Sequence, residues 1–507
     1  METITAKPLI PSEDRIPIRQ KIAFAFGVNM DIFAMSLTLN ALWLPVFNIG
    51  LGIPPLVCSV ILVVLRVWDA FTDPVMGNLS DNTRTRWGRR RPFIFLGTLL
   101  IVLVYPLFWH LPAGWSDMSK VIALTGIGLA FFTAHTVWAM SYYGLQLELT
   151  PNYDERTRLA AWGSIFAKLG YMLMGWVFAF VMLVGMLASG DPRAFDGAGG
   201  FWRGVLEFVQ PAVTWLSAPQ AGESPITVGM RSVCWLICLG MLVFGLCPAL
   251  FVRERYYQGQ ARRQPKTAFL KSLRESFHCQ PLWPLIGMTF FLLIGAAFID
   301  GLYQYVNFYY VCEGDLLLGG KIIGLKGTLK MFIGLASIPV LTKLSERFDK
   351  RIIAVSVLSL LVLGHLANYF LLIPGHPYLQ LFTAFSEAIA IPAIWMFMPA
   401  MKADVADWDE HHTGRRREGS INSFYSWFVK AAHTVSVLFN GAALQWSGFN
   451  AKLPAQSGEV VNRMFVFYLC LPVAFWLLAI TFAWFYPLGR KAALAIRSEL
   501  ERRRGKI

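Results

Sequence analysis

Long apolar segments alternate with short polar ones along almost the whole chain. Each apolar segment has about the 20 residues that a helix needs to cross the hydrocarbon core of a bilayer. A run of this length in lipid must be helical, because each backbone N–H and C=O then finds its partner within the segment. The pattern predicts twelve spans, at residues 21–48, 53–80, 92–112, 119–149, 159–188, 228–252, 283–311, 321–343, 352–373, 378–402, 420–446 and 463–487.

The predicted spans form two groups of six, which indicates two six-helix bundles. We expect a cytoplasmic tail, a first bundle, a central cytoplasmic loop, a second bundle and a basic cytoplasmic tail, at residues 1–20, 21–252, 253–282, 283–487 and 488–507. In the central loop, Lys266–His278 carries apolar residues at helical spacing between basic ones, which predicts an amphipathic helix on the inner membrane surface. The outer loop at 189–227 is unusually long and aromatic-rich, and it suits either the outer membrane surface or a cap over the entrance.

A short internal repeat supports this division. Leu79-Ser80-Asp81 follows the second span, and Leu344-Ser345-Glu346 follows the eighth. Two halves with matching loops are typical of a major facilitator, whose substrate site lies between the halves near the midplane of the membrane. The predicted fold class is therefore an all-α polytopic membrane protein with twelve transmembrane helices in two bundles and both termini cytoplasmic.

Composition and charge agree with a membrane protein. Of 507 residues, 56% are hydrophobic and 15% are charged, whereas about a quarter of a soluble domain is charged. The net charge of +14 does not indicate nucleic-acid binding, because the basic residues gather after even-numbered spans and in the C-terminal tail. That distribution is the positive-inside pattern. It predicts a multi-pass protein of the plasma (bacterial inner) membrane, and the seven cysteines show no metal-ligand spacing.

Several charged residues fall inside predicted spans. A carboxylate at a helix centre costs about 2.5 to 3.5 kcal/mol on insertion scales, so each such residue needs a reason. Asp300 and Lys168 suit either a functional or a structural role, and Glu387 suits packing or hydrogen bonding. The complete set is Asp31, Asp69, Asp73, Lys168, Asp300, Glu387 and Lys430.

Asp69 and Asp73 are the most informative of these residues. They lie four residues apart and therefore share one helix face. Two such carboxylates repel each other unless one holds a proton or both hold a cation. Pro74 removes the hydrogen bond to the carbonyl of Ala70, and Thr136 in span four offers a hydroxyl, so we expect an oxygen-rich cation site. The alternative is a structural ion pair of either aspartate with Lys430 or Arg66.

A sugar presents an apolar face and a rim of hydroxyl groups. Its site needs an aromatic side chain for the face and carboxylates for the rim. Trp395 in span ten and Tyr143 in span four are candidates for the aromatic role, because tryptophan stacks and keeps an N–H donor. Asp31 in span one is a candidate carboxylate, or a structural polar contact.

Three segments carry a resemblance to a known family. Residues 66–77 (RVWDAFTDPVMG) with 85–92 (TRWGRRRP) closely resemble the glycoside–pentoside–hexuronide:cation symporters of the major facilitator superfamily. Residues 403–408 (ADVADW) with 414–419 (GRRREG), and 148–156 (ELTPNYDER), support it. The resemblance covers nearly the whole chain.

The resemblance implies roles for particular residues. Asp69 and Asp73 match the family's cation-binding carboxylates, and Thr136 its cation-site hydroxyl. Lys430 matches the span-eleven lysine that is linked to the family's cation site, when one gap is allowed in the alignment. The residues that match sugar-site positions are Asp31, Trp395 and Tyr143. Ala139 replaces the family's second sugar-binding carboxylate, and the span-five arginine is missing, with Lys168 about a turn further on. The substrate therefore need not be a galactoside.

The leading hypothesis is cation-coupled symport of a sugar or glycoside by alternating access, with Na⁺ or H⁺ as the coupling ion and no cofactor. Asp300 and Lys168 join the candidate substrate residues. Cytoplasmic charges are expected to form gate salt bridges, beside their positive-inside role: Arg89, Arg90, Arg91, Glu155, Arg156, Asp404, Asp407 and Arg416. We expect a monomer in contact with membrane lipids and no nucleic-acid partner.

Two other hypotheses remain. A symporter of a lysolipid or another amphiphile predicts a cavity open to lipid. A polytopic membrane enzyme would have to use His278, His411 and His412, which show no nucleophile–base spacing.

Overall fold

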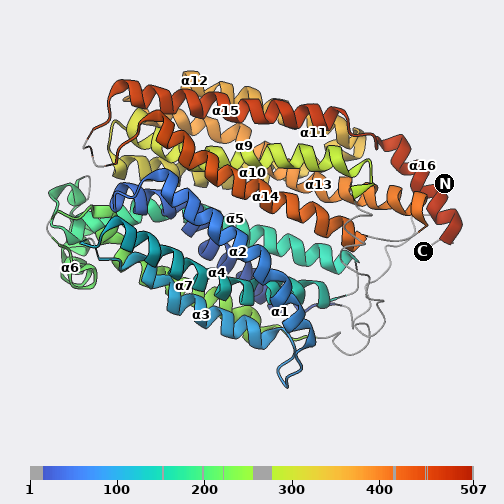
Figure 1. The fold of residues 1–507 in the computed structure, drawn as a ribbon, viewed down its shortest axis with the longest axis horizontal. Helices are drawn as coiled ribbons and strands as arrows, with labels where there is room; N and C mark the ends of the chain where they lie inside the picture. Colours follow the sequence, from blue (N-terminus) through green and yellow to red (C-terminus); the bar gives the residue numbers. More distant parts are fainter. Residues whose placement is uncertain are drawn as a thin grey trace. The chain divides into compact units, whose positions relative to one another are not determined.

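The computed structural model describes residues 15–112, 114–150, 153–196, 199–220, 222–254, 277–414, 418–451, 453 and 455–504. These residues form helices joined by short connections, and an isolated β-bridge between Thr85 and Gly88 closes a turn (Figure 1). The chain divides into two compact units. Unit 1 takes its residues from Met1–Leu51, Val64–Met174 and Phe180–Pro265, and unit 2 from Gly52–Val63, Gly175–Ala179 and Lys266–Ile507.

The helices of the N-terminal half, in chain order, are α1 (Ile18–Asp31), η1 (Ile32–Leu42), η2 (Pro45–Gly50), α2 (Pro55–Asn82), α3 (Arg91–Trp109), α4 (Asp117–Glu148), α5 (Tyr153–Ala188), η3 (Pro192–Phe195), α6 (Gly200–Ser217) and α7 (Pro225–Phe251). Those of the C-terminal half are α9 (Leu282–Tyr305), η4 (Val306–Val311), α10 (Leu316–Arg347), α11 (Lys350–Leu366), α12 (Asn368–Leu371), η5 (Pro377–Thr383), α13 (Ala384–Thr413), α14 (Glu418–Ser447), α15 (Gly458–Trp484) and α16 (Arg490–Arg504).

In the described chain, 11 helical segments are long and apolar enough to cross a membrane. They correspond to eleven of the twelve predicted spans. The predicted span 420–446 corresponds to helix α14, which carries Lys430 and other polar residues and is not among those segments. A crossing by α14 therefore stays a prediction, as do the sides on which the termini lie. The predicted amphipathic helix at Lys266–His278 falls almost wholly on residues 255–276, which lie outside the described residues.

Local sequence signals set where many helices begin. Ser116 and Asp315 accept hydrogen bonds from the backbone N–H groups of Ser119 and Leu318, at 3.2 and 2.9 Å, and so cap the N-termini of α4 and α10. Proline lies in the first turn of α3 and of α7. Both devices deal with the unpaired N–H groups that every helix start leaves.

Glycines let α5 and α7 cross at very short range. A Cβ atom added to Gly185 would lie 1.8 Å from the carbonyl oxygen of Pro225, and one added to Gly229 would lie 2.0 Å from that of Val181. Small residues at such crossings permit close van der Waals contact between membrane helices. The two helices that flank the outer loop are therefore fixed to each other near its base.

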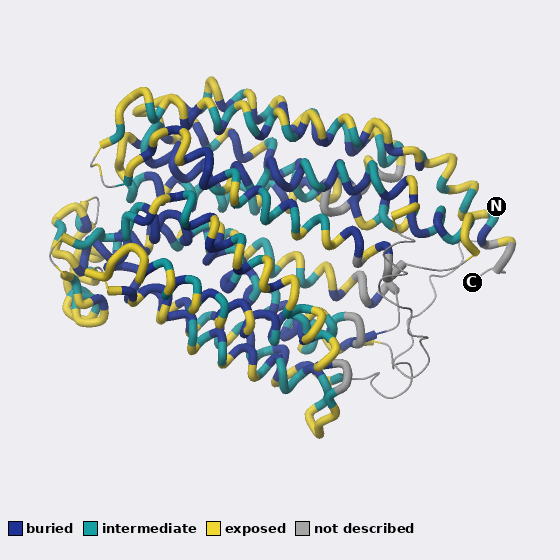
Figure 2. The backbone as a smooth tube through the Cα atoms, viewed as in Figure 1, coloured by how far each residue is buried: buried dark blue, intermediate teal, exposed yellow. Residues whose placement is uncertain are grey.

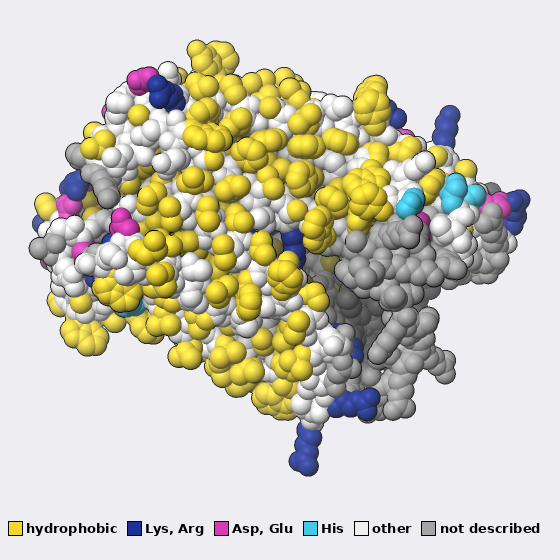
Figure 3. Space-filling model, viewed as in Figure 1, with side chains coloured by type: hydrophobic (Ala, Val, Ile, Leu, Met, Phe, Trp, Pro, Cys, Tyr) yellow, Lys and Arg dark blue, Asp and Glu magenta, His cyan; other side chains and the backbone are white. Residues whose placement is uncertain are grey.

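Most spans have a buried side and an exposed side. Along the spans, buried positions alternate with exposed ones at helical intervals (Figure 2). Many exposed positions carry large apolar side chains, such as Phe71, Leu103 and Phe251, and hydrophobic side chains cover much of the face seen in Figure 3. This is the surface expected of helices that face lipid.

The first helix of each half changes its winding. The α-helix α1 ends at Asp31 and continues as the π-helix η1, and α9 ends at Tyr305 and continues as the π-helix η4. π-helical turns are rare and frequently lie at functional sites. Asp31 therefore lies where the backbone pattern changes.

Candidate functional site

Asp69, Asp73 and Thr136 meet in unit 1. Helix α2 presents both aspartates on one face, and the Thr136 hydroxyl on α4 lies 3.1 Å from Asp69 Oδ1 and 3.3 Å from Asp73 Oδ1. The hydroxyl of Thr72 lies 3.2 Å from that of Thr136. Asp69 is buried. The structure thus gathers carboxylate and hydroxyl oxygens from two helices, which is a ligand set that suits a hard cation.

Arg66 accompanies these carboxylates. It precedes Asp69 by three residues on α2, and it lies within electrostatic range of Asp31, Asp69 and Asp73. Its guanidinium lies over the Phe132 ring, 5.8 Å from the centroid. Arg66 is therefore a positively charged neighbour of all three carboxylates.

Asp31 lies in a second polar group of unit 1. His135 Nε2 lies 2.8 Å from Asp31 Oδ1, and the Tyr143 hydroxyl donates to Asp31 Oδ2 at 2.9 Å. The structure therefore brings the predicted residues Asp31 and Tyr143 together. Sequence reasoning missed His135, although its position directly before Thr136 was an available signal.

Helix α4 connects the two polar groups. His135 and Thr136 are neighbours in sequence, and they reach Asp31 on α1 and the aspartates on α2, respectively. Residues next to each other on a helix point about 100° apart, so one turn of α4 faces both partners. Any shift of this turn moves both groups at once.

Lys168 does not join these groups. It is half-buried on α5 and makes no hydrogen bond or ion pair among the residues that the structure describes. Ala139 is buried on α4, one turn after His135. The substrate role of Lys168 stays a prediction.

Unit 2 buries a different charged cluster. Lys326 Nζ on α10 lies 3.0 Å from Glu387 Oε1 on α13, and Lys330 pairs with the other oxygen, Oε2. Lys326 also lies 4.0 Å above the centre of the Tyr303 ring. Both lysines lie within the predicted span 321–343, four residues apart, and sequence reasoning missed them.

The remaining predicted residues of unit 2 are placed less closely. Asp300 is exposed on α9 and lies within electrostatic range of Lys326 and Lys330. Lys430 is exposed on α14, and its predicted link to the cation site joins residues of different units. The side chain of Trp395 lies outside the described residues. The roles of all three stay predictions.

The basic turn before α3 has a partner that the sequence did not indicate. The backbone N–H groups of Arg89, Arg90 and Arg91 lie 2.8, 2.8 and 3.0 Å from carboxylate oxygens of Glu254, just after α7. Gly88 has φ +107°, and a Cβ atom there would lie 2.5 Å from Glu254 Oε1. A carboxylate at a helix N-terminus is stabilised by unpaired N–H groups and by the helix dipole.

Other predicted gate residues also have partners within their own unit. Glu155 is fully buried and accepts from Ile16 N at 2.9 Å and from Lys21 Nζ at 2.6 Å. Burial raises the pKa of Glu155, but these hydrogen bonds and the charges of Lys21 and Arg158 outweigh it and hold the pKa below its usual value.

In unit 2, Asp404 pairs with Lys350 at 2.6 Å, and Asp407 lies nearby and partly buried. Arg156 and Arg416 have side chains outside the described residues. Salt bridges between the halves stay a prediction.

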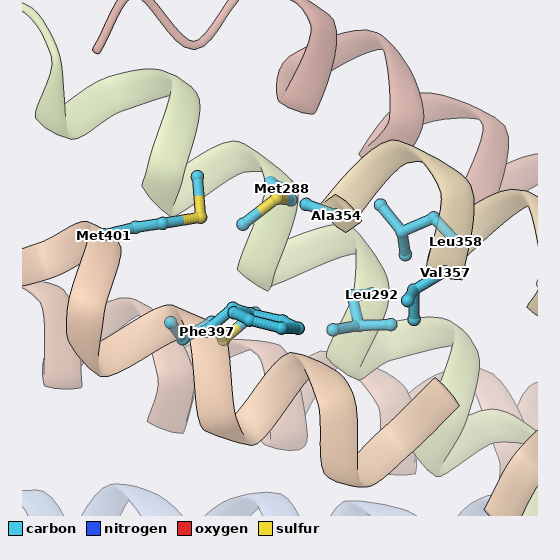
Figure 4. Close-up of a pocket in the computed structure, with 8 residues that line it drawn as sticks. Met288, Leu292, Ala354, Val357, Leu358, Phe397 and Met401 are labelled. Atoms are coloured by element: carbon cyan, nitrogen blue, oxygen red, sulfur yellow. The ribbon is translucent and has the colours of Figure 1, made fainter. Parts of the chain in front are cut away.

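Unit 2 contains an apolar pocket between helices α9, α11 and α13. Met288 and Leu292 of α9, Ala354 and Leu358 of α11, and Phe397 of α13 line it (Figure 4). Its lining offers no hydrogen-bonding side chain for a sugar. Over the described residues, no group of three or more His, Cys, Asp or Glu side chains is arranged to hold a metal ion.

Comparisons with known proteins agree on a transporter. The chain is 24% identical to an uncharacterised symporter of Synechocystis, over 97% of this chain and 98% of that protein. It is 25% identical to a glucuronide carrier protein homolog of Escherichia coli (strain K12), over 96% of each. It is 24% identical to the sodium-dependent lysophosphatidylcholine symporter 1-B of Danio rerio, over 89% of this chain and 83% of that protein.

Solved structures share the fold. A bacterial homolog of the human lysosomal transporter Spinster, in an inward-facing conformation, matches with a TM-score of 0.59 and 14% identity over 95% of this chain and 97% of that one. A D-xylose–proton symporter matches with a TM-score of 0.57 and 12% identity over 93% and 96%. These identities are low, so the likeness establishes the major facilitator fold alone.

The family described as MFS/sugar transport protein matches residues 25–490. With the apolar helices, this match makes the chain a multi-pass protein of the plasma membrane, the inner membrane in bacteria. The predicted resemblance to the cation symporters of the major facilitator superfamily is thereby confirmed. The chain belongs to the MFS/sugar transport protein family, whose relatives named above are symporters and carriers.

Proposed function

We propose that the protein is a secondary transporter that couples the entry of a sugar or glycoside to the inward flow of Na⁺ or H⁺. One observation carries the proposal. Consecutive residues of α4, His135 and Thr136, contact a candidate substrate carboxylate, Asp31, and a pair of candidate cation carboxylates, Asp69 and Asp73. Neither site needs a cofactor beyond the coupling cation.

The cation step rests on charge. Asp69 and Asp73 lie on one face of α2, and the hydroxyl of Thr136 on α4 lies within hydrogen-bond distance of both carboxylates. Na⁺ bound to these oxygens, or a proton on one carboxylate, relieves the repulsion between the two acids. Either ion also neutralises negative charge in a region that is costly to charge in lipid.

The substrate step rests on Asp31. Its carboxylate accepts hydrogen bonds from Tyr143 and, in the tautomer protonated at Nε2, from His135, and these contacts fix its orientation. A sugar hydroxyl that donates to an oriented carboxylate makes a charge-assisted hydrogen bond, which is stronger than one between neutral groups. The cation steadies the turn of α4 through Thr136, and that turn holds Asp31 through His135. Binding of the cation thus favours binding of the sugar.

Transport then needs the membrane potential. One elementary charge that moves across 100 mV contributes about 2.3 kcal/mol. The two halves of a major facilitator expose the site first to one side and then to the other. Release of the cation and the sugar on the inside completes the cycle.

The test is uptake of a labelled panel of hexosides, pentosides and uronides into proteoliposomes. It is run with an imposed Na⁺ gradient, then an H⁺ gradient, then neither. We expect accumulation that one gradient drives and that ends when the gradient is dissipated. Uptake that is the same with either gradient as with none would contradict the proposed coupling.

A second candidate is symport of an amphiphile. The similarity to the sodium-dependent lysophosphatidylcholine symporter 1-B of Danio rerio supports it. A labelled lysolipid joins the same panel. Accumulation of the lysolipid but of no glycoside would favour this candidate and keep the cation site.

A further inference from the structure

Helix α6, in the predicted outer loop, exposes a row of large aromatic side chains. Phe201, Phe208 and Trp215 follow one another at intervals of seven residues, which is close to two helical turns, so they share one face. Their exposed fractions are 76%, 84% and 81%. Trp202 and Leu216 extend this apolar face along one flank of the helix and are exposed as well. A helix in water normally presents polar side chains on such a face.

The opposite face of α6 is fixed to unit 1. Gln210 Nε2 donates to the carbonyl of Leu187 at 3.1 Å, and the Thr214 hydroxyl donates to that of Ala188 at 3.4 Å. The Ser217 hydroxyl lies 2.5 Å from that of Ser232 on α7. These bonds hold the polar face inward and leave the aromatic face outward.

The C-terminal end of α6 has a second attachment. The guanidinium of Arg231 on α7 donates to the carbonyls of Ser217 and Ala218, both at 3.4 Å. Glu223, in the connection between α6 and α7, pairs with the same guanidinium at 2.8 Å. The helix therefore does not swing freely on its two connections.

These contacts also fix the depth of α6. Leu187 and Ala188 are the last residues of α5 and of its segment that is long and apolar enough to cross a membrane. On α7, Trp235, Leu236 and Leu239 follow Ser232 by one to two turns and are exposed. In a bilayer this arrangement would bring the aromatic face to the boundary between the lipid tails and water, where tryptophan is enriched in membrane proteins.

We propose that α6 lies in the interfacial layer of the adjoining leaflet, with Phe201, Phe208 and Trp215 inserted among the lipids. The Arg203–Glu207 pair, at 3.2 Å, lies on the other flank and stays in water. An amphipathic helix with aromatic residues on one face and charged residues on the other lies in this layer of a bilayer. The helix holds the ends of α5 and α7 at a constant depth.

Spin labelling of the full chain tests the proposal. Cys470 and Cys247 are replaced by serine, because the other five cysteines are buried, and this background is labelled as a blank. A nitroxide is then placed at position 208 by Phe208→Cys, or at position 203 by Arg203→Cys as the matched control. Both positions are exposed on the same helix. Each protein is reconstituted in phospholipid vesicles.

The readout is the accessibility of each nitroxide to molecular oxygen, which partitions into lipid, and to a water-soluble nickel chelate. We expect the oxygen-to-nickel ratio at position 208 to exceed that at position 203 several-fold. Equal ratios with high nickel access would place the aromatic face in water and overturn the proposal. Low access to both probes at position 208 would mean that protein covers the face, either this chain over the entrance or a second copy, and would overturn it too.

Discussion

The two units bury charged side chains in opposite ways. Unit 1 brings Asp31, Asp69 and Asp73 within electrostatic range of Arg66, with Thr136 and Tyr143 as hydroxyl donors. Unit 2 places one carboxylate, Glu387, between Lys326 and Lys330, so that each of its oxygens meets an ammonium group.

The difference is the one expected between the proposed cation site and a structural cluster. A buried charge is tolerated when it is paired, and the Glu387 cluster meets that condition without a ligand. In the proposed cation site of unit 1, two carboxylates of α2 instead share one hydroxyl, that of Thr136, and like charges this close repel each other unless a cation or a proton lies between them. Two like charges on one helix face, more than burial itself, are the better indicator of where an ion binds.

The largest expected effect comes from removing one carboxylate of the proposed cation site in unit 1. Asp69→Asn or Asp73→Asn should lower gradient-driven accumulation in proteoliposomes to the level of simple equilibration, because the oxygen set for the cation is broken. The matched control is Asp117→Asn, which removes an exposed carboxylate at the start of α4. Unaltered accumulation in both site variants would contradict the assignment of Asp69 and Asp73 to a cation site.

In unit 2 the corresponding change should affect folding. Glu387→Gln leaves two lysines without their shared carboxylate, and breaking a buried pair costs about 3 to 5 kcal/mol. Thermal unfolding in nanodiscs should show a clear loss of stability. Lys330→Gln should cost less, because Lys330 is partly exposed and Lys326 still pairs with Glu387. If Glu387→Gln were as stable as wild type but inactive, the cluster would be functional.

A smaller change should weaken substrate binding alone. His135→Phe removes the contact with Asp31 Oδ1, and we expect the half-saturating sugar concentration to rise about tenfold, or about 1.4 kcal/mol. The half-saturating cation concentration should change little at saturating sugar, because Thr136 is intact. His135→Gln, which keeps a donor, should recover part of the affinity. Equal effects of both variants on cation and sugar would mean that His135 acts on the packing of α4.

The units resemble each other at the third helix of each half, and this likeness is testable. Glu254 caps the start of α3 in unit 1, and Asp349 caps α11 in unit 2 by accepting from Arg351 N at 2.9 Å. The other oxygen of Asp349 accepts from Arg490 N at the start of α16, at 2.8 Å. Glu254→Gln and Asp349→Asn should each lower the free energy of unfolding by about 1 kcal/mol. A loss confined to one variant would show that the two caps are not equivalent.

The smallest effect concerns pH. The pKa of Glu155 lies below its usual value of 4.5, so its contribution to stability is present above pH 4.5 and is lost as the pH falls through the lowered pKa. Glu155→Gln should remove a contribution of about 1 kcal/mol near neutral pH, because the neutral amide oxygen can still accept from Ile16 N and Lys21 Nζ. Stability curves of wild type and variant, measured by thermal unfolding, should converge below pH 4.5. Parallel curves would show that Glu155 is not the source of the loss of stability at low pH.

The local parts of this comparison were predictable from sequence, and the long-range parts were not. Hydrophobic runs predicted twelve spans, and the structure has a helix at each of them, eleven of which are long and apolar enough to cross a membrane. The spacing of Asp69 and Asp73 predicted their shared face. His135 meets Asp31 across 104 residues, and Lys326 meets Glu387 across 61. No local pattern encodes such contacts. The eleventh predicted span, 420–446, is a helix as expected, but the polar residues of α14 lower its hydropathy, and its membrane crossing stays a prediction.

Glu254 has a practical consequence for dividing the chain. A fragment that ends with α7 at Phe251 would contain every helix of the N-terminal half and yet leave three N–H groups at the start of α3 without their acceptor. A fragment that is three residues longer contains Glu254 and restores the acceptor for these N–H groups. Anyone who expresses the halves separately, or inserts a reporter protein between them, should therefore place the junction after residue 254.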